Sequence, residues 1–469
     1  MWATWASSVH NLDYGNEVEP IKALSACAPR SPLAGSVPVP SDDGVLLSRV
    51  LLALLSRGES SFRISHPSRA VTSVFDALDA LGLLRFEDEE RAFVRGLGLG
   101  LGSLGACPPL DFRGEAAAGA FILAALCGRA GAPEVWVDAA VGDTLGAFLA
   151  EHGLAELEAR GSDFVVRLGA ATTRWPGFEA ELSGAIPWLK PAYLALALRA
   201  ASPSTLIEKF LSADHFERAL FRARAPVQIE PTAIGIHPPR DEDALGPEQY
   251  EHIGSAYLAS HLLVLPLLCP AGGEVTVRDV SSNRSSAEVW SLLRLLGADL
   301  RVHPKGDRQG EPVADVTLRA SSPLRGGVHV AGEQALRIGD GILPLLPAIA
   351  LGALPSHLSD LTFTRRDATP RILPRAVGFL KQAGFSAQIE GASVILGGTP
   401  GRPLAPLIVT TGAEPRLALL GGLLALTRLE ASTIDDVSCL SHIYPRFAGT
   451  LRSLGGQASV QAAHAPFHS

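Results

Sequence analysis

Hydrophobic positions recur along this chain in blocks of about 72 residues. Six times, a segment with apolar residues at helical spacing is followed by a short alternating run that is typical of a strand. In five blocks a glycine follows the helix, because glycine adopts the left-handed conformation of a helix C-terminus without steric penalty. In the third block Ala225 and Pro226 stand there, and we expect the proline to end the helix. The six pivots are residues 82, 153, 225, 297, 384 and 455.

A second helix in each block is apolar on nearly every face. A helix of this kind has to be buried on all sides. The predicted buried helices span residues 45–55, 116–126, 192–198, 256–268, 342–354 and 417–426. With the short strands, each block is predicted to form a βαβαββ unit, with its helices packed inward and its sheet facing solvent.

The spacing of the blocks also predicts two similar halves of three units each. One interval between pivots, from 297 to 384, is about 15 residues longer than the others, and we assign the insertion to the polar segment 305–312. Proline, glycine and acidic residues concentrate at 231–247, and a second proline-rich segment lies at 29–40. We therefore expect two lobes, residues 1–38 with 233–469 and residues 39–232, joined by two crossing segments. A hinged cleft between such lobes is a usual place for a small ligand.

Composition and charge exclude several classes of protein. The 469 residues are 47% hydrophobic and 19% charged, which suits large cores and not a disordered chain. The net charge of −8 disfavours a nucleic-acid-binding surface. The five cysteines are scattered without CxxC spacing, so we expect no disulfide framework, no metal site and a cytoplasmic protein. The longest apolar stretches are interrupted by proline or polar residues, and the first residues lack a signal-peptide pattern, so we expect no membrane partner.

Five segments carry motifs that can be compared with those of known families. They are residues 38–52 (PVPSDDGVLLSRVLL, similar to PGSKSxSxRALLLAAL), 110–120 (LDFRGEAAAGA, similar to LxxGNAGTAxR), 366–384 (RDATPR…FLKQAG, similar to KETDR…ELRKLGA), 414–416 (EPR, similar to DHR) and 439–447 (CLSHIYPRF, similar to CxxKxYPxF). Together, and in this order, they resemble the enolpyruvyl transferases over nearly the whole chain, and EPSP synthase (3-phosphoshikimate 1-carboxyvinyltransferase) most of all. That family is a two-lobed inside-out α/β barrel with six βαβαββ repeats, three per lobe, which is the fold class that the resemblance implies.

The resemblance implies a transfer of a carboxyvinyl group from phosphoenolpyruvate to a hydroxyl of shikimate 3-phosphate. That chemistry needs a base, an acid and cations that hold the substrate phosphate and carboxylate. By position, the implied catalytic residues are Asp340 and His442. The implied substrate-binding residues are Arg49, Lys190, Ser212, Arg371 and Arg416. The resemblance implies no cofactor and no metal.

Several positions depart from the family pattern. Asp42 or Asp43 replaces the lysine of the opening motif, which reverses the charge. The phosphate-side NAGT turn becomes Gly-Glu-Ala-Ala at 114–117, and the glutamate of KETDR becomes Ala368. Each lost lysine or arginine removes charge-assisted hydrogen bonds to phosphate. We therefore expect the ordinary reaction to be lost, while Arg371 and Arg416 at the carboxylate-clamp positions keep the planar guanidinium that suits a carboxylate.

Our leading interpretation is a diverged member that binds a small-molecule carboxylate or phosphorylated substrate, as a monomer without nucleic-acid or membrane partners. The alternative from another class is a catalytically inactive homologue that acts as a binding or scaffold protein, since an arginine on a helix is most often a solvated side chain. An RNA 3′-phosphate cyclase of related fold would need a basic groove, which the charge of −8 disfavours. An amino-sugar enolpyruvyl transferase would need a cysteine motif that the chain lacks.

Overall fold

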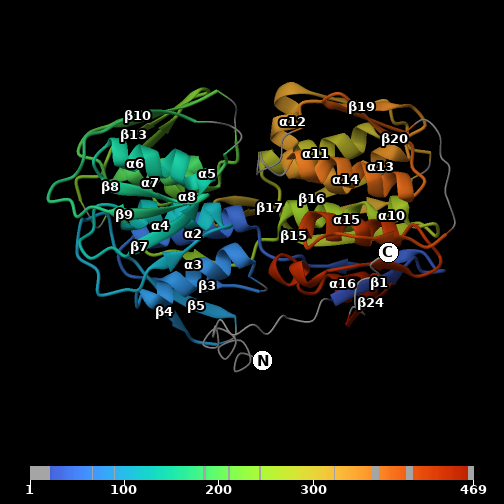
Figure 1. The fold of residues 1–469 in the computed structure, drawn as a ribbon, viewed down its shortest axis with the longest axis horizontal. Helices are drawn as coiled ribbons and strands as arrows, with labels where there is room; N and C mark the ends of the chain where they lie inside the picture. Colours follow the sequence, from blue (N-terminus) through green and yellow to red (C-terminus); the bar gives the residue numbers. More distant parts are fainter. Residues whose placement is uncertain are drawn as a thin grey trace. The chain divides into compact units, whose positions relative to one another are not determined.

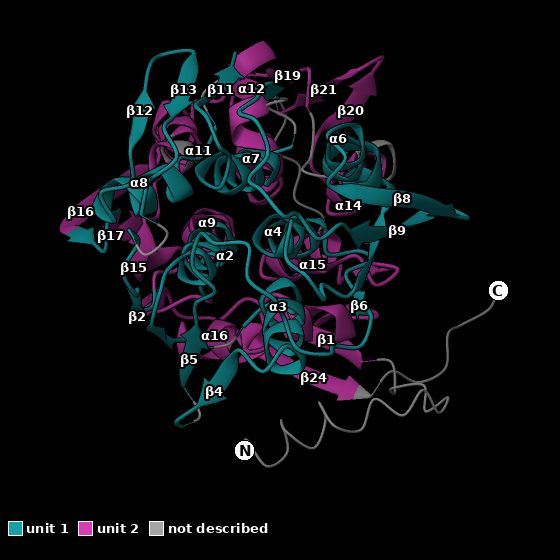
Figure 2. Cartoon of the chain, turned by 90° about the vertical axis from the view of Figure 1, so that its left-hand side faces the viewer, with its two compact units in different colours: residues 1–15, 41–252, 307–311 teal, residues 16–40, 253–306, 312–469 magenta. Residues whose placement is uncertain are grey.

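The computed structural model describes residues 22–462 except 66, 89, 183–185, 210–211, 242–243, 322, 362–368 and 398–404. The described chain divides into two compact units (Figure 2). Unit 1 contains residues 41–252 and 307–311, and unit 2 contains residues 22–40, 253–306 and 312–462. No described helix is long and apolar enough to cross a membrane.

The described strands form six four-stranded sheets (Figure 1). In each sheet an edge strand pairs in parallel with the second strand, which pairs antiparallel with the third. The sheets that contain the strands of unit 1 are β14 (Gln249–Tyr250), β3 (Glu59–Arg63), β5 (Arg91–Arg95), β4 (Leu84–Phe86); β6 (Leu110–Asp111), β7 (Glu134–Asp138), β9 (Asp163–Leu168), β8 (Ala155–Arg160); and β10 (Glu179–Leu182), β11 (Ser204–Glu208), β13 (Ala233–Ile236), β12 (Val227–Ile229).

The sheets of unit 2 have the same order of parallel and antiparallel strands. They are β2 (Leu33–Val37), β15 (Gly273–Ser281), β17 (Glu311–Arg319), β16 (Asp299–Arg308); β18 (His329–Val330), β19 (Ser356–Leu358), β21 (Ser393–Leu396), β20 (Ala387–Glu390); and β22 (Ile408–Val409), β23 (Ser432–Ile434), β1 (Lys22–Cys27), β24 (Gln457–Ala462). The early strands β1 and β2 thus pair with strands from the second half of the chain.

One set of helices is buried and lies inside each unit. In unit 1, α2 (Asp43–Leu55), α4 (Ala116–Leu126) and α7 (Leu189–Leu198) pack against one another, with the sheets around them (Figure 2). Unit 2 has the corresponding buried helices α9 (Ala256–Leu263), α10 (Leu265–Leu268), η2 (Gly339–Leu345), α13 (Leu346–Ala350) and α15 (Pro415–Ala425). Burial of helices that are apolar all round is the main stabilising term of such a fold. The predicted α/β class with inward helices is confirmed.

The helices of the second set pack against the first set or against the sheets. These helices are α3 (Arg69–Ala80), α5 (Ala139–Val141), η1 (Gly142–Gly146), α6 (Ala147–Glu151), α8 (His215–Arg222), α11 (Arg284–Leu295), α12 (Gly332–Ile338), α14 (Thr369–Gln382), η3 (Ser438–His442) and α16 (Phe447–Ser453). The five pivot glycines all have positive φ, as the C-cap reasoning predicts. The third pivot was placed wrongly, because the left-handed residue is Arg224 with φ 57°, one position before Ala225.

The inserted segment 305–312 lies in the hairpin of β16 and β17. These strands have 10 and 9 residues, whereas the corresponding β8 and β9 have 6 each. The tip of the hairpin, residues 307–311, belongs to unit 1, where its contacts bear on a predicted site residue.

Candidate ligand-binding site

Lys190 and Ser212 of unit 1 meet on a carboxylate that the motif comparison did not single out. Glu208 at the end of β11 accepts hydrogen bonds from Lys190 Nζ at 3.2 Å, from Ser212 N at 2.8 Å and from Ser212 Oγ at 2.6 Å. Lys190 is buried because it lies in the core helix α7. The lysine and serine that the resemblance assigns to a substrate anion therefore already hold an internal one.

A second carboxylate completes this cluster. Glu217 of α8 lies 2.6 Å from Lys190 Nζ and is buried like it. Burial alone would lower the pKa of Lys190, but the charges of Glu217 and Glu208 outweigh burial and raise it. Burial raises the pKa of Glu217, and Lys190 only partly offsets that effect. A buried ammonium needs such partners to remain charged.

Arg49 also donates hydrogen bonds to acceptors within the protein. Its side chain in α2 is 1% exposed, and Nη1 donates to Glu248 Oε2 at 3.2 Å. Nη2 donates to the carbonyl oxygen of Gln309, at 2.5 Å, in the tip of the inserted hairpin. The insertion therefore supplies the oxygen that Arg49 binds in this structure.

A further ion pair joins the same hairpin to α8. His215 Nδ1 lies 3.0 Å from Glu311 Oε1, and the glutamate side chain is fully buried. Burial would lower the pKa of His215, but Glu311, Asp42 and Asp214 raise it to about 9. At neutral pH His215 is therefore an imidazolium that binds Glu311.

The carboxylates that replace the lysine of the opening motif lie at the start of α2. Asp42 is the N-cap residue, and its Oδ1 accepts a hydrogen bond from Val45 N at 3.2 Å. Burial, together with the charges of Asp42 and Glu115, raises the pKa of Asp43 to about 7, although a hydrogen bond with Ser68 lowers it. This helix terminus, which could attract a substrate anion, already has protein carboxylates next to it.

In unit 2 the structure brings together Asp340 and Arg416, two of the residues that the resemblance singles out. Arg416 Nη1 donates to Asp340 Oδ2 at 3.3 Å. On its other edge, Nε and Nη2 donate to the two oxygens of Glu414 at 2.7 Å and 3.5 Å. The guanidinium is 14% exposed, and the carboxylates are 23% and 25% exposed, so solvent reaches all three groups. Glu414 and Asp340 hold the guanidinium in one orientation at the start of α15.

Two further polar side chains lie near this cluster on α9. Tyr257 is half-buried, and His261, one turn later, is fully buried. Burial and the charge of Asp340 raise the pKa of Tyr257, although Arg416 lowers it. Sequence reasoning missed both residues because they lie within an apolar helix.

Arg371 and His442 are the two remaining predicted site residues. Arg371 lies in α14, but its side chain is outside the described residues, as is the segment 366–368. His442 ends the short helix η3, which packs against α15, and its side chain is exposed. Their roles stay predictions. Within the described residues, no group of histidine, cysteine, aspartate and glutamate side chains could hold a metal ion.

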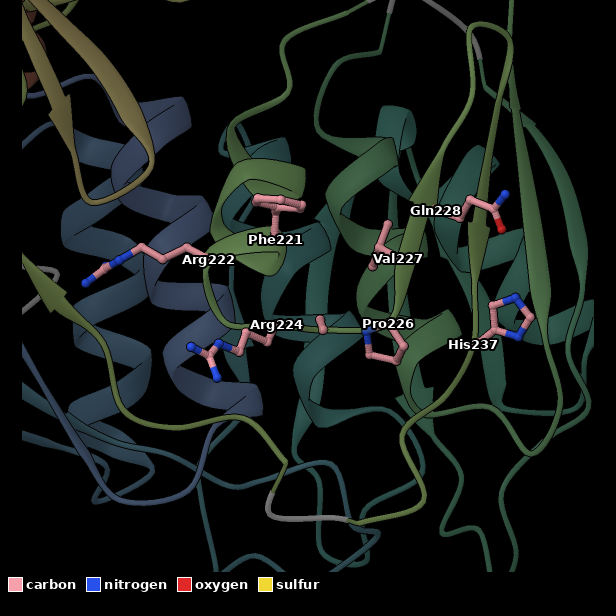
Figure 3. A pocket seen from close by; sticks show the side chains of 8 residues that line it. Phe221, Arg222, Arg224, Pro226, Val227, Gln228 and His237 are labelled. Carbon is pink, nitrogen blue, oxygen red and sulfur yellow. The ribbon is translucent and has the colours of Figure 1, made fainter.

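A hollow of about 660 Å³ lies elsewhere in unit 1, between the end of α8 and the hairpin of β12 and β13 (Figure 3). Its lining includes Phe221, which is 79% exposed, Arg224 and His237. None of the sequence-predicted site residues lines it.

The comparisons with known proteins agree with the motifs. The family model described as EPSP synthase (3-phosphoshikimate 1-carboxyvinyltransferase) matches residues 27–451. The chain belongs to the EPSP synthase family. It is 28% identical to a 3-phosphoshikimate 1-carboxyvinyltransferase of Methylorubrum populi, over 96% of this chain and 100% of that protein. A protein of the same name from Chloroflexus aurantiacus is also 28% identical, over 92% of this chain and 98% of its own length.

Solved structures confirm the fold of this EPSP synthase family member. EPSP synthase from Acinetobacter baumannii superposes with a TM-score of 0.79 at 18% identity, covering 94% of this chain and 100% of that one. The enolpyruvyl transferase NikO from Streptomyces tendae gives 0.73 at 15% identity, covering 95% and 100%. At these identities the likeness concerns the fold, and the activity has to be argued from the site.

Proposed function

We propose that this chain binds a small carboxylate at Arg416 in unit 2 and has lost carboxyvinyl transfer from phosphoenolpyruvate to shikimate 3-phosphate. The observation that carries the proposal is the contrast between the two units. In unit 1 the buried Lys190 pairs with Glu208 and Glu217. The buried Arg49 pairs with Glu248 and donates to the carbonyl oxygen of Gln309 at the hairpin tip. Arg416 in unit 2 is fixed in place but still reached by solvent.

The donors of Arg416 support this assignment. A guanidinium has five N–H groups, and its hydrogen bonds to Glu414 and Asp340 use three of them. Among the described residues this leaves one N–H on each terminal nitrogen, and two guanidinium N–H groups can bind the two oxygens of a carboxylate. Phosphate-binding lysines and the NAGT turn are replaced in this sequence, so a carboxylate is the better match.

Calorimetry on the full chain tests the binding half of the proposal. We expect pyruvate and phosphoenolpyruvate to bind weakly, inorganic phosphate to bind less tightly than pyruvate, and Arg416→Ala to abolish binding with little change in melting temperature. The control is Arg337→Ala, because Arg337 also pairs with two carboxylates in unit 2, Glu333 and Glu288. Equal binding by Arg416→Ala and the parent protein would overturn the proposal.

A phosphate-release assay with phosphoenolpyruvate and shikimate 3-phosphate tests the catalytic half. We expect no turnover, because the lysine of the opening motif is absent and position 368 is alanine instead of glutamate. In addition, Lys190 is already paired with Glu208 and Glu217. Turnover within about tenfold of an ordinary enzyme's ~10 per second would contradict this expectation.

A catalytically inactive homologue that acts as a binding or scaffold protein is the second candidate. The observation that favours it is that Arg416, like Lys190 and Arg49, already has carboxylate partners. The same calorimetry separates the two candidates, since this one predicts no binding of any small carboxylate by the parent protein.

A further inference from the structure

Tyr257, which is half-buried, and His261, which is fully buried, form an aromatic pair on one face of α9. Their rings meet edge-on with centroids 4.8 Å apart and an interplanar angle of 84°. His261 Nδ1 lies 3.0 Å from the carbonyl oxygen of Tyr257. A carbonyl only accepts hydrogen bonds, so Nδ1 carries the proton and Nε2 keeps its lone pair. Burial lowers the pKa of His261 to about 4, so the imidazole is neutral at pH 7.

The phenol hydroxyl of Tyr257 and Nε2 of His261 are both buried, and neither has a hydrogen-bond partner among the described residues. An unpartnered buried polar atom destabilises a fold, and native proteins leave few of them. Two such atoms on one turn of a helix therefore call for an explanation beyond packing. A ligand oxygen that accepts from the Tyr257 hydroxyl would give that hydroxyl the partner that the described residues do not supply, whereas Nε2 of His261 is itself an acceptor.

Tyr257 lies on a helix that packs against the elements of the Arg416 site. Helix α9 packs against η2 and α15, the elements that carry Asp340 and Arg416. The charges of Asp340, Arg416 and Glu414 all act on the phenol. Because burial and the nearby carboxylates raise its pKa, Tyr257 is protonated at neutral pH and offers a donor.

We propose that the Tyr257 hydroxyl donates a hydrogen bond to the 2-oxo oxygen of an acid whose carboxylate is held by Arg416. The inference rests on the proposed function, since it takes the Arg416 site as the place where the ligand binds. The two remaining N–H groups of Arg416 match the two carboxylate oxygens, so the phenol proton is left for a third oxygen. Tyr257 then makes the site selective for 2-oxo acids over simple carboxylic acids.

The test is calorimetry with pyruvate and with propionate, which lacks the 2-oxo oxygen. In Tyr257→Phe we expect pyruvate to bind about tenfold more weakly and propionate to bind as it does to the parent protein. The control is Tyr444→Phe, in which the hydroxyl of another buried tyrosine of unit 2 is removed. Burial raises the pKa of Tyr444 and a hydrogen bond with Thr450 lowers it, whereas Asp340, Glu414 and Arg416 do not contribute. We expect Tyr444→Phe to leave both affinities unchanged.

Thermal unfolding of the same variants gives an independent readout. Because none of the described residues bonds to the hydroxyl, Tyr257→Phe should keep or slightly raise the melting temperature. A fall of several degrees would show that the hydroxyl is already bonded and would overturn the inference. Unchanged pyruvate binding in Tyr257→Phe, or equal loss of both acids, would overturn the role of Tyr257 alone. Failure of the parent protein to bind either acid would overturn the proposed function and this inference with it.

Discussion

Arg224, two residues after the end of α8, has a backbone conformation that the other repeats give to glycine. Its φ is 57°, and the residue at the same place is glycine after α3 and α6. A side chain in the left-handed region destabilises the chain by about 1 kcal/mol, because Cβ approaches the backbone. We expect Arg224→Gly to raise the free energy of unfolding by about 0.5–1 kcal/mol, measured by urea denaturation.

The reverse substitution is the control for that prediction. Gly82 has φ 67°, and a Cβ built there meets no atom within 4 Å, so only backbone strain changes. Gly82→Ala should therefore lower the free energy of unfolding by about 1 kcal/mol. If Arg224→Gly were destabilising while Gly82→Ala behaved as expected, contacts of the Arg224 side chain would outweigh its backbone strain.

Lys190 is a buried charged residue that stabilises the fold through its two ion pairs. It neutralises Glu208 and Glu217 in a buried cluster. Lys190→Met would leave two carboxylates close together without a cation, and losing one partner of a buried pair costs about 3–5 kcal/mol. Urea denaturation should show that loss, and the same substitution with Glu217→Gln added should restore part of it. A loss below about 1 kcal/mol in Lys190→Met would contradict the cluster as described.

Candidate residues were predictable from the sequence only where a motif carries them. Asp340 and Arg416 lie 76 positions apart, and the resemblance alone pointed to both. Glu208 stands four positions before Ser212 in an alternating strand, where a glutamate is unremarkable. The partners of Arg49 are 199 and 260 positions away, and only the fold brings them together. Local pattern cannot show that a predicted cation is already paired.

At the scale of elements, two glycines on helices have opposite roles. Gly422 lies in the buried α15, and a Cβ built there would come within 2.5 Å of the Phe447 ring and 3.5 Å of Leu24. Gly378 lies in α14, and a Cβ there meets nothing within 4 Å. We expect Gly422→Ala to destabilise by about 1–3 kcal/mol through overpacking. Gly378→Ala should stabilise by up to about 1 kcal/mol through helix propensity.

Thermal unfolding of both variants measures that difference, with each glycine serving as the control for the other. A Gly422→Ala protein as stable as its parent would mean that Phe447 has room to turn away. The test matters for the fold because the close approach of α15 to α16 and β1 depends on that missing side chain.

The buried helices were the most predictable elements, because a helix that is apolar on every face is stable only inside the core. The predicted segments 45–55 and 116–126 match α2 and α4 closely. The segment 342–354 became a 3₁₀ turn, η2, followed by the short α13, because Pro344 removes a hydrogen-bond donor within it. The error at the third pivot arose because the sequence signal was Pro226, while the turn was made two residues earlier by Arg224.

At the scale of the whole molecule, Asp43 and His215 are two groups whose raised pKa values make stability fall as the pH rises. Burial and neighbouring carboxylates raise the pKa of Asp43 to about 7, and the charges of Glu311, Asp42 and Asp214 raise that of His215 to about 9. A group whose pKa is higher in the folded state stabilises the fold when protonated. The contribution of Asp43 is complete below about pH 4 and is lost as the pH rises through 7. That of His215 is complete below about pH 6.5 and is lost as the pH rises through 9.

Above pH 6.5 both contributions have the same sign, so the melting temperature should fall between pH 7 and pH 9.5. Below pH 6.5 the lowered pKa of His261 opposes the contribution of Asp43. The side chain of His215 is 12% exposed, and its pairing with Glu311 should contribute about 1–3 kcal/mol at pH 6. His215→Gln should remove the decline above pH 7. Asp43→Asn should leave the contribution of His261 unopposed, so that stability rises from pH 5 to pH 6.5. Melting curves of the three proteins at half-unit steps of pH measure both parts. A parent protein whose stability is flat or rises between pH 7 and pH 9.5 would show that His215 is not held in the protonated form, and that the charges around α2 and the tip of the hairpin are arranged differently from the structure described above.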